Sequence, residues 1–204
     1  MAARKRGRDA QVEQNRELLL AAARRVFLAR GYPGSTLEAI AAEAGFSKGV
    51  VYSQFESKAD LFLALLDERI EERAAENARV VHTAGGGAAA VAALCALGRG
   101  RARKEADWNL LLLEFRAQAA RDPALNESYA KAHARAIDGI AILLGGMFDA
   151  AGVEPTQPPR ILATFVLALT SGVHLENLVV PDSLPATAVI ELIQRSLGLG
   201  MEET

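Results

Sequence analysis

The chain contains few of the residues on which disulfide bonds and metal sites depend. It has one cysteine, Cys95, and three histidines, His82, His133 and His174, among 204 residues. A single cysteine forms no intramolecular disulfide and no multi-cysteine metal site. The histidines are isolated and none has a partner at metal-ligand spacing. We therefore expect no metal and no cofactor.

The usual signals for export and for membrane insertion are also missing. The basic start, Arg4-Lys5-Arg6-Gly7-Arg8-Asp9, is not followed by the apolar stretch of a signal peptide. No apolar run approaches the ~18 residues that are needed to cross a bilayer. We therefore expect a cytoplasmic protein without a membrane partner.

The composition is poor in aromatic residues, at 5 %, and rich in apolar ones, at 50 %. Many are Ala and Leu, which favour helices. The net charge of −2 combines two different parts. Residues 1–60 hold 10 Lys and Arg against 7 Asp and Glu, whereas residues 61–204 hold 13 against 18. A basic end on an acidic body is typical of a DNA-binding region joined to a part that does not touch DNA.

Helical periodicity runs along the whole chain and no strand pattern appears, so we expect an all-α fold. The expected helices are residues 12–30, two short helices between 36 and 55, then 57–81, a small Ala-rich helix, 102–121, 123–150, 158–180 and 185–197. Glycine triplets or pairs at Gly85-Gly86-Gly87 and Gly98-Arg99-Gly100 are expected to bracket the Ala-rich helix, which holds Cys95.

The two short helices have the clearest local signals. Thr36 is a natural N-cap of the first helix, Gly45 ends it by turning left-handed, and Ser47 caps the second. Two short helices joined by a tight turn form the unit that places its second helix in a DNA major groove. Val51 and Phe55 are four residues apart and face inward. The remaining side chains of the second helix face outward, and contact with DNA accounts for their exposure.

A longer run of residues carries a family resemblance. The run consists of Thr36, Ile40-Ala41, Ala44-Gly45-Phe46-Ser47-Lys48-Gly49-Val50-Val51-Tyr52-Ser53-Gln54-Phe55, Ser57-Lys58 and Leu61-Phe62. It resembles the DNA-binding domain of TetR-family transcriptional regulators, with a close match over roughly residues 14–64. Beyond it, only the length, the helical pattern and the generic layout of Glu114-Phe115, Arg121-Asp122-Pro123 and Ser171-Gly172 fit. Where many relatives carry His before the phenylalanine, this chain has Gln54.

Residue chemistry and the resemblance together give an expected DNA-binding set. Its members are Thr36, Ser47, Lys48, Gly49, Val50, Tyr52, Ser53, Gln54 and Lys58. Thr36 and Ser47 start helices, where hydroxyls and backbone amides favour phosphate. Lys48 reaches either a phosphate or a guanine edge, and Val50 meets a thymine methyl group. Gln54 either binds a phosphate or reads adenine.

Two basic clusters outside this set have simpler interpretations. Arg4 to Arg8 form either an arm that seeks the minor groove or phosphates, or a solvated disordered tail. The second cluster, Arg99, Arg101, Arg103 and Lys104, lies beside glycines and is expected to be a solvated loop.

An enzyme is the least favoured class. Gly45-Phe46-Ser47-Lys48-Gly49 matches the G-x-S-x-G pattern of a serine-hydrolase nucleophile elbow. That elbow requires a strand before the serine and a helix after it, whereas residues 37–44 have a helical pattern. We therefore expect no enzymatic activity. The stronger alternative is an all-helical small-molecule-binding protein without operator function.

The predicted domains are residues 1–56, which bind DNA and include a basic arm at 1–10, and residues 57–204. The resemblance implies that the second domain dimerises and holds an inducer pocket. Candidate ligand-binding residues are Trp108, Leu111, Phe115, Arg116, Met147, Phe165, Thr170, His174 and Asn177. The aromatic and apolar members equally suit a helical core. Thr170, His174 and Asn177 share one side of an apolar helix, where buried polar groups need partners. Glu114 lies on a polar helix face, and solvent is its simpler assignment.

Helices near residues 125–150 and 160–180 are suited to a dimer interface. They carry small residues that permit close approach, namely Ala132, Ala136, Gly139, Gly145, Gly146, Ala163 and Gly172. They also carry more apolar surface than one partner helix covers, which indicates a four-helix interface between two copies. The sequence thus predicts a homodimeric repressor that binds a double-stranded DNA operator and is released by a mainly apolar small-molecule inducer.

Overall fold

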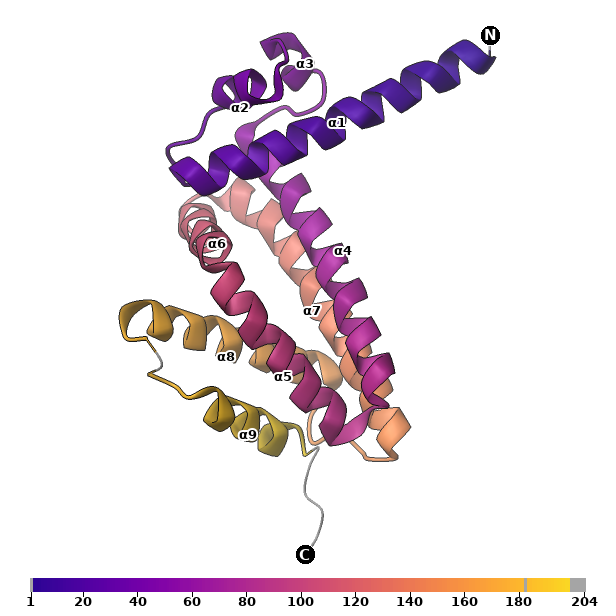
Figure 1. The fold of residues 1–204 in the computed structure, drawn as a ribbon, viewed down its shortest axis with the longest axis vertical. Helices are drawn as coiled ribbons and strands as arrows, with labels where there is room; N and C mark the ends of the chain where they lie inside the picture. The colour runs from indigo at the N-terminus through magenta and orange to yellow at the C-terminus, as the bar shows by residue number, and fades with distance from the viewer. Residues whose placement is uncertain (1, 182, 199–204) are drawn as a thin grey trace, which may run out of the picture. The chain divides into compact units, whose positions relative to one another are not determined.

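The computed structural model describes residues 2–181 and 183–198, and every regular element in that part of the chain is a helix (Figure 1). The helices are α1 (Ala2–Arg30), α2 (Leu37–Ala44), α3 (Lys48–Tyr52), α4 (Lys58–Ala84), α5 (Gly87–Lys104), α6 (Ala106–Ala119), α7 (Pro123–Ala151), α8 (Pro159–Val179) and α9 (Ala186–Leu197). The predicted all-α class is confirmed.

The chain packs as two compact units, each discontinuous in sequence. Unit 1 holds the described residues up to Arg69 together with Leu110–Ala132. Unit 2 holds Ile70–Asn109 and the described residues from His133 onward. Helices α4, α6 and α7 therefore contribute residues to both units. The functional boundary after residue 56 stays a prediction, because packing alone does not assign function.

Unit 1 is built around a cluster of aromatic rings. Phe62 of α4 stacks on Phe115 of α6 with ring centroids 4.2 Å apart, and Tyr32 meets Phe115 edge-on at 4.9 Å. Phe27 of α1 and Tyr129 of α7 extend the cluster. Stacked and edge-to-face rings stabilise a core beyond the burial of their area. The cluster therefore holds parts of α1, α4, α6 and α7 together within unit 1.

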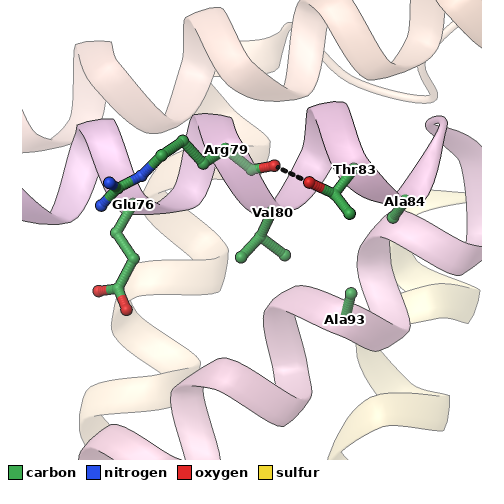
Figure 2. Close-up of a pocket in the computed structure, with 6 residues that line it drawn as sticks. All are labelled: Glu76, Arg79, Val80, Thr83, Ala84 and Ala93. Atoms are coloured by element: carbon green, nitrogen blue, oxygen red, sulfur yellow. Dashed lines mark hydrogen bonds between the residues drawn. The ribbon is translucent and has the colours of Figure 1, made fainter.

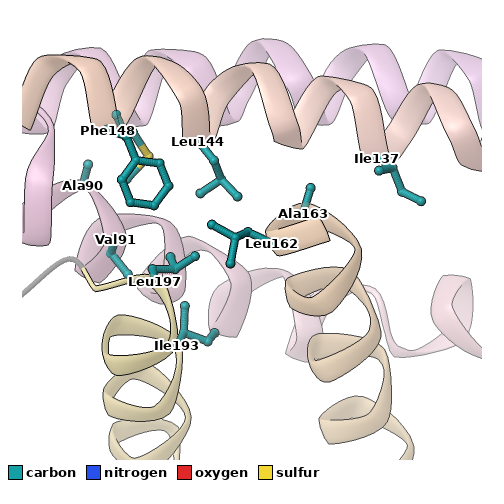
Figure 3. Packing of buried hydrophobic residues seen from close by; sticks show 10 residues of the cluster. Ala90, Val91, Ile137, Leu144, Phe148, Leu162, Ala163, Ile193 and Leu197 are labelled. Carbon is teal, nitrogen blue, oxygen red and sulfur yellow. The ribbon is translucent and has the colours of Figure 1, made fainter. Parts of the chain in front are cut away.

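Unit 2 has a mainly aliphatic core, drawn in Figure 3. Its buried members come from α5, α7, α8 and α9: Ala90, Val91, Ile137, Leu144, Met147, Phe148, Leu162, Ala163, Ile193 and Leu197. Figure 3 shows Phe148 and Leu144 of α7 directed toward Leu162 of α8. The small residues Ala90 and Ala163 are fully buried, which allows the helices to approach closely.

Several helix ends lie where the sequence predicts them. Ser57 Oγ accepts the Asp60 N–H at 3.1 Å and so caps α4. Asp122 Oδ1 accepts the N–H groups of Ala124 and Leu125, both at 3.1 Å, at the start of α7. These carboxylate and hydroxyl oxygens satisfy amides that have no partner inside the helix. Local sequence therefore determines these ends.

Three predicted boundaries are wrong. α1 begins at Ala2, well before the predicted residue 12, so the basic segment continues the helix. α5 runs through Gly98 and Gly100 to Lys104, although these glycines were expected to end it, and α6 begins at Ala106 rather than at the predicted residue 102. Glycine costs a helix only about 1 kcal/mol, and Arg101, beyond both glycines, is hydrogen-bonded to Glu76 and Asn77 of α4. Long-range contacts of this kind are not visible in the local glycine signal.

α8 corrects the expectation that no segment is apolar enough to cross a bilayer. By length and composition alone α8 passes that test, with a mean hydropathy of 1.4. Only 11 % of its most apolar window is buried in the single chain. An apolar helix with an uncovered face is also typical of a protein–protein interface.

Candidate nucleic-acid interface

The α2–turn–α3 segment forms because its ends are defined locally. Thr36 Oγ1 accepts the Ala39 N–H at 3.2 Å at the start of α2. Gly45 ends α2 with a φ of +72°, a left-handed conformation that glycine adopts without a Cβ clash. Ser47 occupies the N-cap position of α3, although its hydroxyl makes no capping hydrogen bond. The predicted helix–turn–helix is therefore present in unit 1.

α3 and the turn around it have one buried and one open side. Val51 and Phe55 are 0 % and 3 % exposed, whereas Tyr52 is 51 % exposed. The exposed members of the predicted DNA-binding set are Thr36, Ser47, Lys48, Gly49, Tyr52 and Ser53, and the half-buried ones are Val50, Gln54 and Lys58. Hydroxyl, ammonium and phenol groups on the open side are the kinds of group that contact DNA phosphates and bases.

Gln54 faces the protein rather than open solvent. Its Nε2 donates to the Val12 carbonyl of α1 at 3.5 Å. Its Oε1 is buried and has no hydrogen-bond partner among the described residues. Gln54 therefore links the end of the helix–turn–helix to α1, and its DNA contact stays a prediction.

Lys58 has protein partners in this structure. Its Nζ donates to the carbonyl oxygens of Tyr32 at 2.7 Å and of Ser35 at 3.0 Å. The ammonium also lies over the Tyr32 ring, 4.4 Å from the centroid, where a cation is attracted to the π face. Burial lowers the pKa of Lys58. The residue thus holds the turn between α1 and α2, and its predicted phosphate contact remains untested.

The same turn is held from α6. Glu114 Oε2 accepts the Tyr32 N–H at 2.8 Å. The Ser35 hydroxyl donates to the Gly31 carbonyl at 2.7 Å, and Ser35 is fully buried. Gly31 has a φ of +69°, and a Cβ there would lie 2.7 Å from Glu114 Oε2. Glycine at this position therefore lets the carboxylate approach the backbone.

Glu114 is a correction to the sequence analysis. The polar face of its helix suggested solvent, but its carboxylate lies in unit 1 on the amide of Tyr32. Tyr32 itself is buried, which together with Asp60 and Asp122 raises its pKa to about 12. Glu114, Tyr32 and Ser35 were not predicted to form one structure. The only signal was the glycine at residue 31.

The basic clusters differ from their predicted form. The backbone of residues 2–9 is helical, while their side chains lie outside the described part. Arg99 and Arg101 belong to α5, so the solvated loop is wrong. Arg101 donates to Asn77 Oδ1 at 2.9 Å and to Glu76 Oε2 at 3.0 Å. The side chains of Arg103 and Lys104 also lie outside the described part.

The predicted ligand-binding residues fall in both compact units. Leu111, Phe115 and Arg116 belong to unit 1, and Trp108, Met147, Phe165, Thr170, His174 and Asn177 belong to unit 2. Phe115 packs in the aromatic cluster and Met147 in the unit 2 core. Both are core residues in this structure. Trp108 and Leu111 are also buried, whereas Phe165 is exposed. Their roles toward a ligand stay predictions.

The three polar residues of α8 differ in their surroundings. Thr170 is exposed, and its hydroxyl donates to the Val166 carbonyl of the same helix at 2.8 Å, so it is not a buried group in need of a partner. Asn177 Oδ1 accepts the Ser183 hydroxyl at 3.2 Å. His174 Nε2 is buried without a partner among the described residues. Burial lowers the pKa of His174.

A shallow groove lies between α4 and α5 in unit 2 (Figure 2). It has a volume of about 430 Å³ and is lined by Glu76, Arg79, Val80, Thr83, Ala84 and Ala93. None of these belongs to the predicted ligand-binding set. The groove is open, and it does not test where an inducer binds.

A second surface is the outward face of α8, here termed the α8 stripe. It consists of Ile161, Phe165, Ala168, Gly172, Leu175 and Val179, whose spacing places them on one side of the helix. Val179 is 80 % exposed, and Ile142 on α7 is 77 % exposed. A Cβ on Gly172 or Gly139 would meet no described atom within 4 Å. Unit 2 thus has an apolar face that one chain leaves uncovered.

The G-x-S-x-G match does not have the structure of a nucleophile elbow. Ser47 lies between α2 and α3, so a helix rather than a strand precedes it. Without the strand-to-helix turn the serine is not presented above a sheet.

Comparison with known proteins assigns both halves of the chain. Residues 19–65 match the family model of bacterial regulatory proteins of the tetR family. Residues 86–199 match the model of the C-terminal region of BetI-type transcriptional repressors. The second match alone covers more than half of the chain.

Individual relatives agree with these matches. The HTH-type transcriptional repressor AcnR of Corynebacterium glutamicum is 28 % identical over 160 residues, which cover 78 % of this chain and 79 % of AcnR. Among solved structures, FadR from Bacillus subtilis in complex with stearoyl-CoA has a TM-score of 0.69 at 15 % identity, covering 89 % of this chain and 98 % of FadR. GusR of Salmonella enterica has a TM-score of 0.69 at 21 % identity, covering 91 % and 96 %. The two structures show a shared fold.

Proposed function

Because the chain belongs to the TetR family of bacterial regulatory proteins, we propose that it is a homodimeric transcriptional repressor. In this proposal the dimer binds a palindromic operator and is released when a mainly apolar small molecule binds. The protein acts in the cytoplasm, where its DNA is. The observation that carries the proposal is the open polar side of the α2–turn–α3 segment beside a buried Val51 and Phe55.

The DNA contacts are assigned by chemistry. Thr36, Ser47, Ser53 and Tyr52 offer hydroxyls to phosphates, and Gly49 allows the backbone to approach closely. Lys48 contacts a phosphate or a guanine edge, Val50 a thymine methyl group, and Gln54 a phosphate or adenine. Lys58 has two carbonyl partners, and an ammonium has three N–H donors. The remaining N–H of Lys58 is assigned to a phosphate in this proposal, in competition with the Tyr32 ring that the ammonium faces.

The dimer is supported by the α8 stripe and by Ile142 of α7. Large apolar side chains that one chain leaves exposed are stabilised when a second copy covers them. Two such helices from each copy form a four-helix interface with twofold symmetry. The symmetry of the dimer then matches the symmetry of a palindromic operator.

The inducer is proposed to be mainly apolar because apolar residues outnumber polar ones in the candidate ligand-binding set. The relative FadR, of similar fold, was solved with stearoyl-CoA, a ligand with a long apolar chain. A ligand releases DNA only if it prefers a conformation in which the recognition helices no longer match the operator. We assign this conformational change to α4, because the helix runs from Lys58, beside the helix–turn–helix, to Ala84 in unit 2.

The DNA proposal is tested by selecting tight-binding duplexes from a random library and measuring affinity at physiological salt. We expect a roughly palindromic sequence with half-sites about 34–36 Å apart or slightly more. Substitutions at Lys48 and Val50 should change base preference. Equal affinity for selected and random duplexes would refute the proposal and favour a ligand-binding protein without operator function.

The inducer proposal is tested by titrating stearoyl-CoA and a series of smaller lipophilic compounds into the operator complex. Trp108 is the only tryptophan, so its emission reports on unit 2. A compound that releases DNA should also change Trp108 emission, and Arg116→Ala should weaken the response. Release with unchanged emission and an unchanged Arg116→Ala response would place the ligand elsewhere.

A further inference from the structure

A carboxylate lies inside the predicted DNA surface and is paired with one of that surface's own donors. Glu38, in the first turn of α2, accepts a hydrogen bond from Lys48 Nζ at 3.2 Å. Both side chains are partly exposed, at 43 % for Glu38 and 65 % for Lys48. Hydrogen bonding to the backbone at the start of α2, and then Lys48, lowers the pKa of Glu38.

The donor that holds this carboxylate is one that a DNA phosphate also uses, because a lysine ammonium is a common phosphate contact. Lys48 belongs to the predicted DNA-binding set and is exposed. The anion that occupies it in the free protein comes from the chain itself.

We propose that Glu38 stands in for a DNA phosphate in the free protein, so that DNA must displace this carboxylate to reach Lys48. The inference rests on the proposed DNA-binding function. It makes Glu38 a specificity-determining residue. Lys48 attracts the phosphates of any duplex, whatever its sequence, and this attraction is weakened because Glu38 already balances the charge of Lys48. Contacts that other residues make to base edges are unaffected.

The chain offers a matched control on the same helix. Glu43, at the other end of α2, pairs with Arg25 of α1 at 2.6 Å. The side chains of Arg25 and Glu43 are 58 % and 42 % exposed, against 65 % and 43 % for Lys48 and Glu38. Neither Arg25 nor Glu43 belongs to the predicted DNA-binding set. Glu43→Gln therefore removes the same charge and a similar ion pair away from the proposed site.

The experiment compares Glu38→Gln and Glu43→Gln in the full-length protein. Fluorescence anisotropy gives the dissociation constants for a random-sequence duplex and for the selected operator over a range of salt concentrations. Glu38→Gln should tighten random-duplex binding about two- to fivefold, as expected for loss of an exposed ion-pair competitor. Its salt dependence should steepen by up to about one unit for each recognition helix. Glu43→Gln should change neither to that extent.

Equal effects of the two variants, or weaker binding by Glu38→Gln, would overturn the proposal. Weaker binding to the operator alone would mean that Glu38 reads a base. A thermal unfolding curve for each variant shows whether α2 remains folded, because loss of a helix-stabilising residue also weakens binding.

A second arm uses Lys48→Ala as background. Adding Glu38→Gln there should give little further gain, since the ammonium that the carboxylate occupies is absent. A full gain in this background would overturn the proposal, because the carboxylate would then act by direct repulsion of DNA. Failure of the proposed function looks different: the wild-type protein would not distinguish the selected duplex from random DNA.

Discussion

The two compact units differ in how far contacts within one chain cover their polar and apolar groups. In unit 1 the aromatic rings of four helices contact each other, and the α1–α2 turn is bonded by Glu114 and Lys58. In unit 2 the core is mainly aliphatic, and the apolar α8 stripe remains exposed. The α1–α2 turn of unit 1 therefore has its partners within one chain, whereas the α8 stripe of unit 2 is left uncovered.

The two open surfaces differ in how water solvates them, because one is polar and the other is apolar. The open side of the α2–turn–α3 segment in unit 1 carries hydroxyls, a lysine and a tyrosine, which water solvates in the free protein. The open side of unit 2 is apolar, and its exposure to water costs free energy at all times. A surface of the first kind suits a partner that comes and goes. A surface of the second kind suits a permanent one.

The largest expected effect is on unit 2. Ala168→Asp places a charge in the α8 stripe and should convert a dimer into a monomer. Operator affinity should then fall by at least about 100-fold, because the two recognition helices no longer bind as one unit. Light scattering at micromolar concentration and gel-shift assays measure the two effects.

The matched control is Ala78→Asp on an exposed position of α4. It makes the same chemical change in another helix, so any loss from helix propensity is shared. If Ala168→Asp stays dimeric, or if the wild-type protein is monomeric, the contrast between the two units is wrong.

A smaller effect tests the Glu114–Tyr32 contact within unit 1. Gly31→Ala and Gly45→Ala both place a side chain at a positive φ, +69° and +72°. Only at Gly31 would the new Cβ displace the Glu114 carboxylate and leave the Tyr32 amide without its acceptor. An unpaired buried amide costs about 1–3 kcal/mol. Urea unfolding should show Gly31→Ala less stable than Gly45→Ala by about 2 kcal/mol. Equal losses would mean that the Glu114 contact adds nothing to unit 1.

The smallest effect is a pH dependence. Burial raises the pKa of Tyr32 from 10 to about 12. The folded state therefore holds this proton more tightly than the unfolded state. The protonated Tyr32 phenol therefore contributes to the free energy of unfolding below pH 10, and this contribution is lost as the pH rises from 10 to 12. At pH 11 the loss is about 1.4 kcal/mol relative to pH 9.

Tyr32→Phe should remove this loss, and Tyr52→Phe, at an exposed position, should keep it. Urea unfolding of the three proteins at pH 9 and pH 11 makes the comparison. Tyr32→Phe keeps an aromatic ring beneath the Lys58 ammonium, so the contact between them is retained while the phenol is removed. An identical pH dependence in all of them would contradict the burial of the Tyr32 phenol.

The structure shows which features local sequence can predict. Thr36, Gly45 and Ser57 define helix ends through atoms within a few residues, so their patterns predicted α2 and α4 correctly. Glu114 and Tyr32 are 82 residues apart, and a glutamate on the polar face of a helix usually faces solvent. Gly98 and Gly100 suggested a turn, but α5 continues to Lys104, and Arg101 beyond them is bonded to α4. Pairings of this kind depend on tertiary structure.

The predicted DNA-binding set illustrates the same limit. Helical periodicity correctly separated buried Val51 and Phe55 from exposed Lys48 and Tyr52, because all lie in or directly after the short helix α3. It gave no information about the bond between Gln54, after α3, and Val12 of α1. Sequence pattern thus identified the open face, while long-range packing determined which of its residues also have protein partners.

The Glu114–Tyr32 hydrogen bond has a consequence for hybrid regulators, in which the DNA-reading segment of one protein is joined to the sensor of another. A graft of residues 1–56 alone would carry the Tyr32 amide but leave its acceptor behind. The recipient would have to supply a carboxylate at the equivalent turn of its own sixth helix. Exchange of this segment therefore requires a matching carboxylate in the recipient, and the recipient's sixth helix can be checked for one before any hybrid is made.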